Sequence, residues 1–366
     1  MAAPALVVHG LKVYYHTSRG PFRVVDGVQL ELEQDEILGI AGESGCGKST
    51  VVEGILRLVA PPGRIEAGRV LLYGNRAEAV DVLSLAEEAM RRIRWTRLAY
   101  VPQGSMNSLN PVLRVREQML DAMLDHGARS RSECLDRIPI LLRAVGLTPS
   151  TAEMHPHQLS GGMRQRVVIA NSISLNPEVV VADEPTTGLD VHAQRQVLET
   201  LLRVRREHRV AMIFVSHDLA VHAQLVDRLV VMYAGQVMEI GPVVPMFRDP
   251  RHPYSLGLVA SMVRIGGPRR RLFGIPGLAP SPLEWPGGCR FHPRCPYAFD
   301  RCREVVPVLQ PLEPGRWAAC HLYAEGLTDR LAQARREMLA GPAATGARLQ
   351  EVHAVDQHAA GGEYGE

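Results

Sequence analysis

A glycine-rich stretch near the start of the chain has the residue types and spacing of a phosphate-binding loop. It reads GESGCGKS at residues 42–49, continues the apolar run ILGIA and precedes a segment with helical periodicity. Glycines let such a loop wrap with its backbone N–H groups pointing inward, and the positive end of the following helix favours an anion. The sequence therefore predicts a nucleotide-binding loop made of Gly42, Glu43, Ser44, Gly45, Cys46, Gly47, Lys48, Ser49 and Thr50.

Five side chains in and near this loop have distinct expected roles. Lys48 would reach the β- and γ-phosphates as a point charge, Ser49 would coordinate Mg²⁺ and Thr50 would lie beside the α-phosphate. Two adjacent carboxylates, Asp183 and Glu184, end the apolar stretch VVVADE. Alone they would suggest a solvated strand end. Beside a phosphate-binding loop, Asp183 can reach the Mg²⁺ shell through water and Glu184 can act as the general base for an attacking water.

The C-terminal part of the chain contains a set of four cysteines: Cys289, Cys295, Cys302 and Cys320. The five, six and seventeen residues between them are wider spacings than those of common zinc folds, which disfavours zinc. Four thiolates can also hold an iron–sulfur cluster, or the thiols can be reduced, metal-free and packed as small apolar groups. His292 and His321 could replace a ligand, but four cysteines suffice. Spacing alone leaves these alternatives open.

Composition restricts the class of protein. A chain of 366 residues with 46% hydrophobic content is expected to form a main domain and an appended one. Its 41 basic and 39 acidic residues nearly balance, so no nucleic-acid partner is expected. The sequence has no apolar run long enough to span a bilayer and no signal-peptide pattern. We therefore expect a cytosolic protein, in which cysteines stay reduced or bind a metal or cluster.

Hydrophobic patterning predicts an α/β fold. Short apolar runs bounded by turn residues predict strands at 11–15, 28–33, 37–42, 70–74 and 98–103. Further runs predict strands at 179–185, 211–217 and 228–235. Because β-branched runs alternate with helical segments, these strands should form a buried, mostly parallel sheet. Residues 111–158 have helical periodicity, and the strand pattern ends after Pro242.

At this point the chain resembles the nucleotide-binding subunits of ABC transporters. The segment LSGGMRQR at 159–166 is similar to the signature motif, which in that family caps the γ-phosphate of ATP bound to the opposing subunit. Ser160, Gly161 and Gly162 would open a helix whose free N–H groups suit an anion. The general pattern has Gln where this chain has Met163, and this departure is typical of one peptide-transporter branch.

Other motifs follow in the order of that family. Gln103 in YVPQ resembles the glutamine that links Mg²⁺ and water to the transmembrane contact, and Asp190 lies in a segment that resembles the D-loop. His217 in FVSHD resembles the switch histidine that contacts the γ-phosphate, with a structural histidine as the alternative. Tyr15 aligns with the aromatic residue that stacks on adenine; a core tyrosine, or stacking by Tyr14, is the alternative.

The resemblance covers about residues 5–325 and implies the fold. That fold is an α/β P-loop NTPase with an antiparallel β subdomain, a RecA-like parallel-sheet core and a helical subdomain, followed by a small irregular cysteine-containing domain. We expect the ATPase domain at 1–260, with its helical subdomain at about 104–160. The C-terminal oligopeptide-transporter-type domain should cover 261–325, and residues 326–366 should form a helix and then a disordered tail.

Within the family, three segments are similar to the oligopeptide/dipeptide importer branch: VPQGSMNSLNPV, RHPYSLGLVASM and IPGLAPSPLEWPGGCRFHPRC. Membership of this branch implies a [4Fe–4S] cluster on the four cysteines. The signature and the SMNSLNP segment resemble the first of two paired ATPase subunits. The resemblance therefore implies a heterodimer with a related ATPase, two transmembrane permease subunits and an extracytoplasmic substrate-binding protein.

The resulting hypothesis is an ATP-hydrolysing subunit of an importer for peptides or a related solute, peripheral on the cytoplasmic face of the membrane. Two ATP molecules would be sandwiched between head-to-tail subunits, with Glu184, His217 and Gln103 as catalytic residues. Two alternatives use the same motifs. One is a soluble ABC ATPase acting on ribosomes or damaged DNA, although the second cassette or zinc modules of such proteins are not recognisable here. The other is a redox-regulated nucleotide-binding module.

Overall fold

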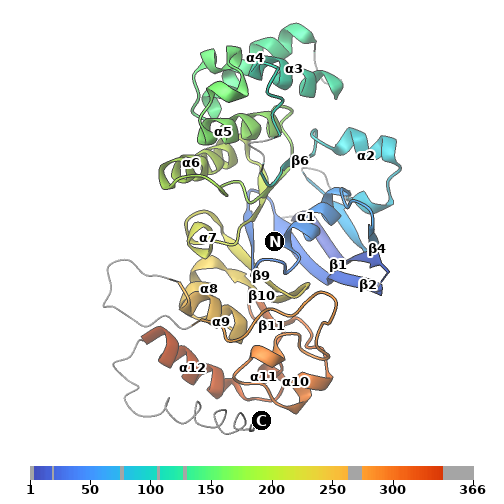
Figure 1. Ribbon diagram of the computed structural model, residues 1–366, viewed down its shortest axis with the longest axis vertical. Helices are drawn as coiled ribbons and strands as arrows, with labels where there is room; N and C mark the ends of the chain where they lie inside the picture. The colour runs from blue at the N-terminus through green and yellow to red at the C-terminus, as the bar shows by residue number, and fades with distance from the viewer. Residues whose placement is uncertain are drawn as a thin grey trace, which may run out of the picture.

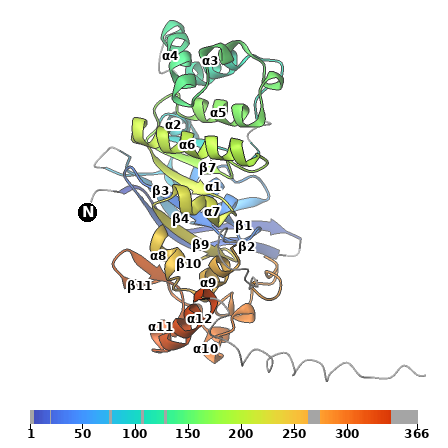
Figure 2. The same ribbon diagram turned by 90° about the vertical axis from the view of Figure 1, so that its left-hand side faces the viewer.

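The computed structural model describes residues 4–18, 20–74, 78–104, 108–126, 130–262 and 274–340. Helices lie at one end of the molecule, two sheets lie in the middle and the C-terminal elements lie at the other end (Figures 1 and 2). None of the helices within these ranges has the length and apolarity needed to cross a bilayer. The tail predicted to be disordered lies mostly beyond residue 340, outside the described residues.

The larger sheet has eight strands in the order β11-β12-β10-β9-β3-β8-β7-β6. Five of them are parallel neighbours: β3 (Ile37–Ala41), β6 (Leu98–Val101), β7 (Val179–Asp183), β8 (Ala211–Val215) and β9 (Arg228–Tyr233). Every residue of β3, β7 and β8 is buried, as expected for strands covered on both faces. This confirms the buried, mostly parallel sheet. Since parallel strands end at one edge, the loops after them meet there.

A smaller antiparallel sheet covers the helix that follows the glycine-rich loop. It contains β1 (Pro4–Thr17), β2 (Gly20–Glu33), β4 (Gly63–Leu72) and β5 (Val80–Asp81), in the order β2-β1-β4-β5. Its buried face shares one apolar core with α1 (Lys48–Leu56), including Val13, Val51 and Ile55. The sequence predicted only parts of its three longer strands, because their remaining residues include many polar side chains and glycines.

Helices surround the sheets where the patterning predicted them. The helical region contains α3 (Val115–Asp125), α4 (Arg131–Ala144), η3 (Pro149–Glu153), η4 (Pro156–Gln158) and α5 (Gly161–Ser172). The remaining helices before β10 are η1 (Val82–Ser84), α2 (Glu87–Ile93), α6 (Val191–His208) and α7 (Leu219–Leu225). Helices α3 to α5 share the core cluster of the large sheet, so the helical region packs continuously with that sheet.

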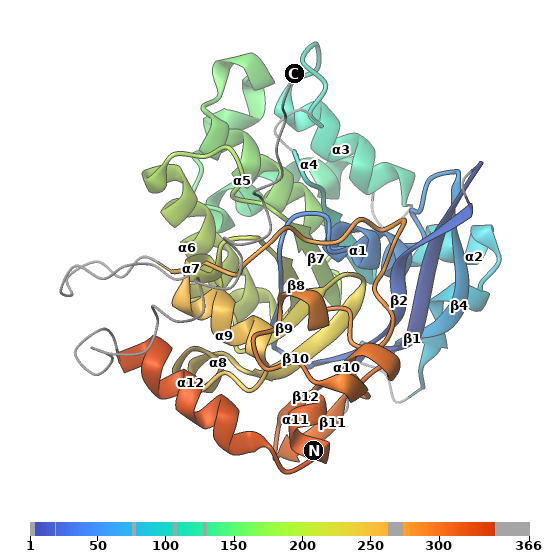
Figure 3. The same cartoon turned by 60° about the horizontal axis from the view of Figure 1, so that its bottom comes forward.

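The C-terminal region extends the large sheet, a feature that the sequence did not predict. It follows β10 (Gln236–Pro242) and consists of α8 (Val243–Arg248), α9 (Pro253–Ala260), η5 (His292–Arg294), α10 (Asp300–Glu304), β11 (Gln310–Glu313), β12 (Arg316–Ala318), α11 (His321–Ala324) and α12 (Thr328–Ala340). Strand β12 pairs antiparallel with β10, and α12 packs against α9 (Figure 3). Strands of three and four residues are too short for their pattern to show in a sequence.

A buried carboxylate joins this C-terminal region to the sheet. Glu239 of β10 is fully buried, and its two oxygens accept the backbone N–H groups of Arg251 and His252, both at 2.8 Å. Arg316 of β12 donates to the same carboxylate at 3.2 Å. Removing one partner of such a buried pair typically costs about 3–5 kcal/mol of stability. The C-terminal region is therefore fixed to the ATPase core by a buried polar link as well as by strand pairing.

A buried histidine gives a prediction for stability at low pH. His222 of α7 is fully buried, and its Nε2 donates to the Ser216 carbonyl oxygen at 3.1 Å. Burial lowers the pKa of His222 to about 4. In the unfolded chain this pKa is about 6.5, so between pH 6.5 and 4 the unfolded state binds the proton and the folded state does not. This one group should cost the folded state about 3 kcal/mol as the pH falls through that window.

The measurement is the free energy of unfolding in urea between pH 7 and pH 4.5, for the wild type and for His222→Gln. Glutamine keeps an N–H donor for Ser216 but has no titratable group. The variant should therefore lose less stability than the wild type as the pH falls. Parallel curves for the two proteins would contradict the assignment of this pH dependence to His222.

Candidate functional site

The glycine-rich loop connects β3 to α1 as a tight turn. Gly42 and Gly47 have φ angles of 153° and 101°, and a Cβ atom on either would lie 2.2 Å and 2.6 Å, respectively, from a backbone oxygen. Only glycine fits these two positions. Lys48, the first residue of α1, is buried, and its Nζ donates to the carbonyl oxygens of Gly42 at 2.9 Å and Glu43 at 3.1 Å. The turn thus curls around a buried ammonium group.

A cavity of about 250 Å³ opens beside this turn. It is lined by Val24, Ser44, Gly45, Gly47, Lys48, Ser49, Thr50, Gln103 and Glu184. Apart from Val24 of β2, the residues come from the glycine-rich turn and the start of α1, from the loop after β6 and from the position after β7, segments that are far apart in the sequence. The structure therefore brings six of the nine predicted phosphate-binding residues together with two of the three predicted catalytic residues, while Gly42, Glu43 and Cys46 are not among the described residues that line this cavity.

Asp183 and Ser49 fit the binding of Mg²⁺. Asp183 ends β7 and is only 1% exposed, and its Oδ1 has no hydrogen-bond partner within the described part of the chain. Burial raises the pKa of Asp183 to about 6, while a hydrogen bond from the Ser49 hydroxyl acts in the opposite direction. A buried carboxylate oxygen without a partner, beside a hydroxyl group, is the type of oxygen donor that Mg²⁺ prefers. Gln103, the third predicted ligand, lines the cavity beside Lys48 together with Ser49.

Three side chains fix the carboxylate of Glu184. Thr187 Oγ1 and Gln103 Nε2 donate to its Oε2 at 2.9 Å and 3.3 Å, and His217 Nδ1 lies 3.2 Å from its Oε1. Glu184 itself has a φ of 47°, in the left-handed region that costs energy for a non-glycine residue and is common at functional sites. This arrangement suits a general base that orients a water molecule.

Thr187 was missed by the sequence analysis. Its hydroxyl lies three residues after Glu184 and reaches back to the carboxylate, much as a capping side chain reaches back at a helix start. The motif DEPTTGLD contains two neighbouring threonines, and the sequence alone does not show which of them faces Glu184. The available signal in the sequence was a hydroxyl residue three positions after the carboxylate of Glu184.

The two candidate adenine-stacking tyrosines lie on opposite sides of β1. The Tyr15 hydroxyl donates to Glu53 of α1 at 3.4 Å, so this ring lies beside the helix that follows the phosphate-binding turn. The Tyr14 hydroxyl donates to Asp26 at 2.9 Å, and its ring faces the guanidinium of Arg23. The geometry favours Tyr15 over Tyr14 for adenine, and stacking itself stays a prediction.

The signature residues lie at the start of α5, apart from the cavity beside Lys48. Ser160 caps this helix, since its Oγ accepts the Met163 N–H at 3.3 Å. None of Ser160, Gly161 and Gly162 is among the described residues that line the Lys48 cavity. Asp190 caps α6 in the same way, accepting the Ala193 N–H at 2.9 Å. Within one chain these motifs therefore form a second surface, separate from the chain's own phosphate-binding turn.

The four cysteines lie together in the C-terminal region. The Cys289 N–H donates to the Cys302 carbonyl oxygen at 2.8 Å. Burial, with a smaller effect of the neighbouring cysteines, raises the pKa of Cys289 to about 11 and that of Cys295 to about 12, and it raises the pKa of Cys320 too. Among the described residues, no three His, Cys, Asp or Glu side chains are arranged to hold a metal ion. The metal or cluster on these cysteines stays a prediction.

The two histidines near the cysteines bond to backbone oxygens. His292 Nδ1 lies 2.9 Å from the Cys289 carbonyl oxygen, and His321 Nε2 lies 2.8 Å from that of Val305. A ring nitrogen that donates to a carbonyl group is occupied by that bond. These contacts give both histidines a structural role next to the cysteine set.

Comparison with known proteins agrees with this geometry. The sequence matches the ABC transporter family over residues 25–187 and the C-terminal region of oligopeptide/dipeptide transporters over residues 238–302. The dipeptide transport ATP-binding protein DppD of Caldanaerobacter subterraneus subsp. tengcongensis is 40% identical, over 87% of this chain and 97% of its own length. DppD of Escherichia coli K12 is 39% identical, over 86% and 96%.

A solved structure shows the same fold for the ATPase part. The cassette MJ0796, solved as a dimer in a post-hydrolysis state with ADP and Pi, superposes with a TM-score of 0.57 and 26% sequence identity. The match covers 65% of this chain and 98% of that cassette. The α/β fold is therefore that of an ABC cassette.

The geometry around Asp183 predicts a metal-dependent defect. Asp183→Asn keeps the shape of the side chain but removes the negative charge that faces the Ser49 hydroxyl. We expect the increase in ATP affinity that Mg²⁺ provides to fall by about 10- to 100-fold. Binding of a fluorescent ATP analogue, titrated with Mg²⁺ and separately with EDTA, measures this change. Wild type and variant should agree in EDTA, and an equal response to Mg²⁺ in both would contradict the assignment.

Proposed function

Because the chain belongs to the ABC transporter family and is an ABC-type ATPase, we propose that it powers the import of dipeptides, oligopeptides or a related solute across the cytoplasmic membrane. The position of Glu184 carries the ATP-hydrolysis part of this proposal, since its carboxylate is held by three side chains at the cavity beside Lys48. The relatives named as dipeptide transport proteins, and the match to the oligopeptide/dipeptide transporter region, support peptides as the substrate class.

In this proposal each side chain of the site has a defined task. The glycine-rich turn and Lys48 bind the phosphates of ATP, and Ser49, Asp183 and Gln103 would hold Mg²⁺, which would neutralise phosphate charge when bound. Glu184 accepts a proton from the water that attacks the γ-phosphate. His217, beside Glu184, would contact the γ-phosphate. Tyr15 would stack on adenine.

We further propose that the active unit is an ATPase heterodimer. Ser160, Gly161 and Gly162 do not line the chain's own Lys48 cavity, which supports a role for them opposite the γ-phosphate of a second, related ATPase subunit, with Asp190 at the same interface. The start of α5 can favour an anion through its free N–H groups. Two permease subunits would receive the motion of this dimer, and an extracytoplasmic binding protein would deliver the solute to them. The chain would then be peripheral on the cytoplasmic face of the membrane.

We also propose a [4Fe–4S] cluster on Cys289, Cys295, Cys302 and Cys320. The four thiols lie close enough for their charges to affect one another, and they are largely shielded from water. A four-iron cluster is larger than a single ion, so it requires its thiolate ligands to stand further apart than one ion does. Thiolate ligands are those that such clusters require.

The catalytic proposal predicts a variant that binds ATP but does not hydrolyse it. In the transporter assembled with its permeases, Glu184→Gln should retain ATP affinity because the side chain keeps its shape, whereas hydrolysis at this chain's own ATP site should fall by about 10²- to 10⁴-fold because the general base is missing. ATP-dependent dipeptide uptake into proteoliposomes should stop with it. Glu199→Gln, on the exposed face of α6, is the matched control and should leave both unchanged. Hydrolysis at the wild-type rate would refute the role of Glu184, and uptake without hydrolysis would refute the coupling.

The cluster proposal is tested by purification without oxygen. The full chain should contain about four iron and four sulfide ions and absorb visible light as such clusters do. Cys295→Ser should lose most of this iron, whereas Cys134→Ser should retain it because Cys134 lies in α4, outside the set. A chain purified in this way that contains neither iron nor sulfide would end the proposal.

A further inference from the structure

An arginine from the C-terminal region reaches the phosphate-binding turn. Arg294, directly before Cys295, donates through Nη1 and Nη2 to the two carboxylate oxygens of Glu43, at 2.7 Å and 3.0 Å. Glu43 is the second residue of the glycine-rich turn, 251 positions earlier in the chain. Two parallel N–H···O bonds between ionised groups form the strongest type of side-chain contact.

The surroundings of Arg294 fix the guanidinium in place. Its Nε donates to the Pro276 carbonyl oxygen at 2.8 Å, and Nη1 also donates to the Tyr233 hydroxyl at 3.2 Å. The Arg294 side chain is only 7% exposed, so the ion pair is largely shielded from solvent. The hydrogen bonds that Arg294 donates to Glu43 and Tyr233 raise its pKa further above the ordinary value. Arg294 is thus a permanent, immobilised positive charge beside the turn.

The backbone of Glu43 is held from the same side. Its N–H donates to the Tyr254 hydroxyl at 2.9 Å. The Tyr254 ring packs against Tyr233 and Phe291, with ring centres 4.7 Å and 5.3 Å away. Phe291 lies between Cys289 and Cys295 in the sequence, so this aromatic cluster connects the cysteine segment to the turn. The side chain of Glu43 is therefore held by Arg294 and its backbone by Tyr254, and both residues come after the nucleotide-binding motifs in the sequence.

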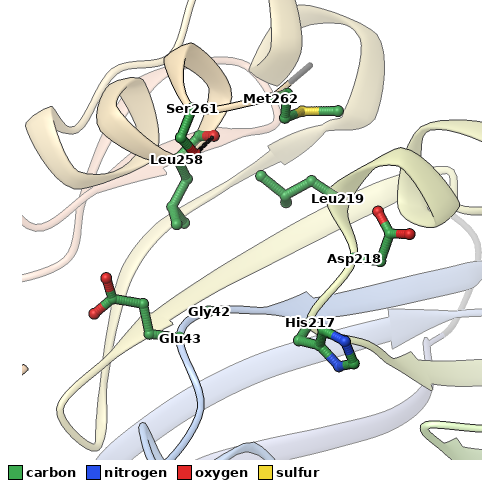
Figure 4. Close-up of a pocket in the computed structure, with 8 residues that line it drawn as sticks. All are labelled: Gly42, Glu43, His217, Asp218, Leu219, Leu258, Ser261 and Met262. Atoms are coloured by element: carbon green, nitrogen blue, oxygen red, sulfur yellow. Dashed lines mark hydrogen bonds between the residues drawn. The ribbon is translucent and has the colours of Figure 1, made fainter. Parts of the chain in front are cut away.

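The direction of the Glu43 side chain explains why its contacts with Arg294 and Tyr254 matter. A second cavity of about 250 Å³ separates the turn from α9, and its walls include Glu43, His217 and Leu258 (Figure 4). In that view the Glu43 carboxylate is turned away from His217. Lys48 Nζ donates to the carbonyl oxygen of Glu43, so the residue belongs to the turn that must receive the phosphates. A free carboxylate there would repel ATP at short range.

We propose that Arg294 is a positioning residue for the nucleotide site: its guanidinium cancels the charge of Glu43 and holds the carboxylate away from the bound phosphates, so the C-terminal region sets the ATP affinity of the turn. The inference rests on the proposed role of this turn in ATP binding. It goes beyond that role because it assigns to the cysteine segment a direct effect on nucleotide affinity, through one ion pair that can be tested separately.

The test removes the charges of this ion pair by substitution in the full-length chain. The Kd for Mg·ATP is measured by displacement of a fluorescent ATP analogue. Arg294→Gln should raise the Kd about ten-fold, the size of effect that one uncompensated charge has near the phosphates. The double variant Arg294→Gln/Glu43→Gln should return to within about three-fold of the wild type, because the repelling charge is then absent. A role of Arg294 in folding alone would give no such rescue.

Arg290→Gln is the matched control. Arg290 lies four residues before Arg294, pairs with Asp26 and has the same side-chain exposure of 7%, but it does not contact Glu43 among the described residues. Its loss should lower the melting temperature and change the Kd less than two-fold. Arg294→Lys keeps the charge but cannot form two parallel hydrogen bonds, and it should weaken the binding of Mg·ATP about three-fold. It provides a second test in case the glutamine variant does not fold.

The outcomes separate this inference from the proposed function. If the wild type does not bind Mg·ATP, the nucleotide-site proposal itself is wrong. If the wild type binds and Lys48→Ala does not, the site stands. Two results would then overturn the role of Arg294 without affecting the site proposal. One is an unchanged Kd for Mg·ATP in both Arg294 variants; the other is a loss of ATP affinity in either variant that adding Glu43→Gln does not restore.

Discussion

A buried ammonium group that forms no ion pair within the described residues is the constraint around which this molecule is organised. Lys48 is 6% exposed, and its Nζ is satisfied by the carbonyl oxygens of Gly42 and Glu43. Removing a cation from water is costly, and carbonyl dipoles offset only part of that cost. An anion that enters the turn offsets the remaining desolvation cost, and this favours the binding of a phosphate. The glycines at positions 42 and 47 are needed because any side chain there would collide with a backbone oxygen.

The parallel sheet supplies the second requirement, which is to bring distant residues to that cation. Strands β3, β6, β7 and β8 are adjacent or nearly adjacent in the sheet and end at the same edge. Residues at or within two positions of these strand ends, such as Gln103, Asp183 and His217, therefore lie near Lys48 regardless of how the connecting helices are arranged. For this reason the sequence could predict most of the site. Each residue lay in a short motif at a strand end, and strand direction determined where the motif would be.

The remaining features depend on contacts that no local pattern encodes. Thr187 was not predicted because two threonines stand side by side and only the turn geometry decides which faces Glu184. Strands β11 and β12 were not predicted because they have only a few residues each, and β12 joins the sheet by pairing with β10 across a long stretch of chain, while β11 pairs with β12. The Arg294–Glu43 pair joins residues that come together only in the folded chain. A charged residue in a sequence gives no indication of which opposite charge, 251 positions away, it will meet.

These long-range contacts change how the C-terminal region should be regarded. It shares the large sheet through β12, its Arg316 reaches the buried Glu239, and its Arg294 reaches the phosphate-binding turn. A segment attached in three ways cannot move independently of the ATPase core, because any displacement would expose a buried charge at two of those points. Cys295 and Cys302 lie between Arg294 and Arg316 in the sequence, and Cys289 and Cys320 lie just outside them. Whatever the thiols bind would therefore stabilise the geometry of the same turn that receives ATP.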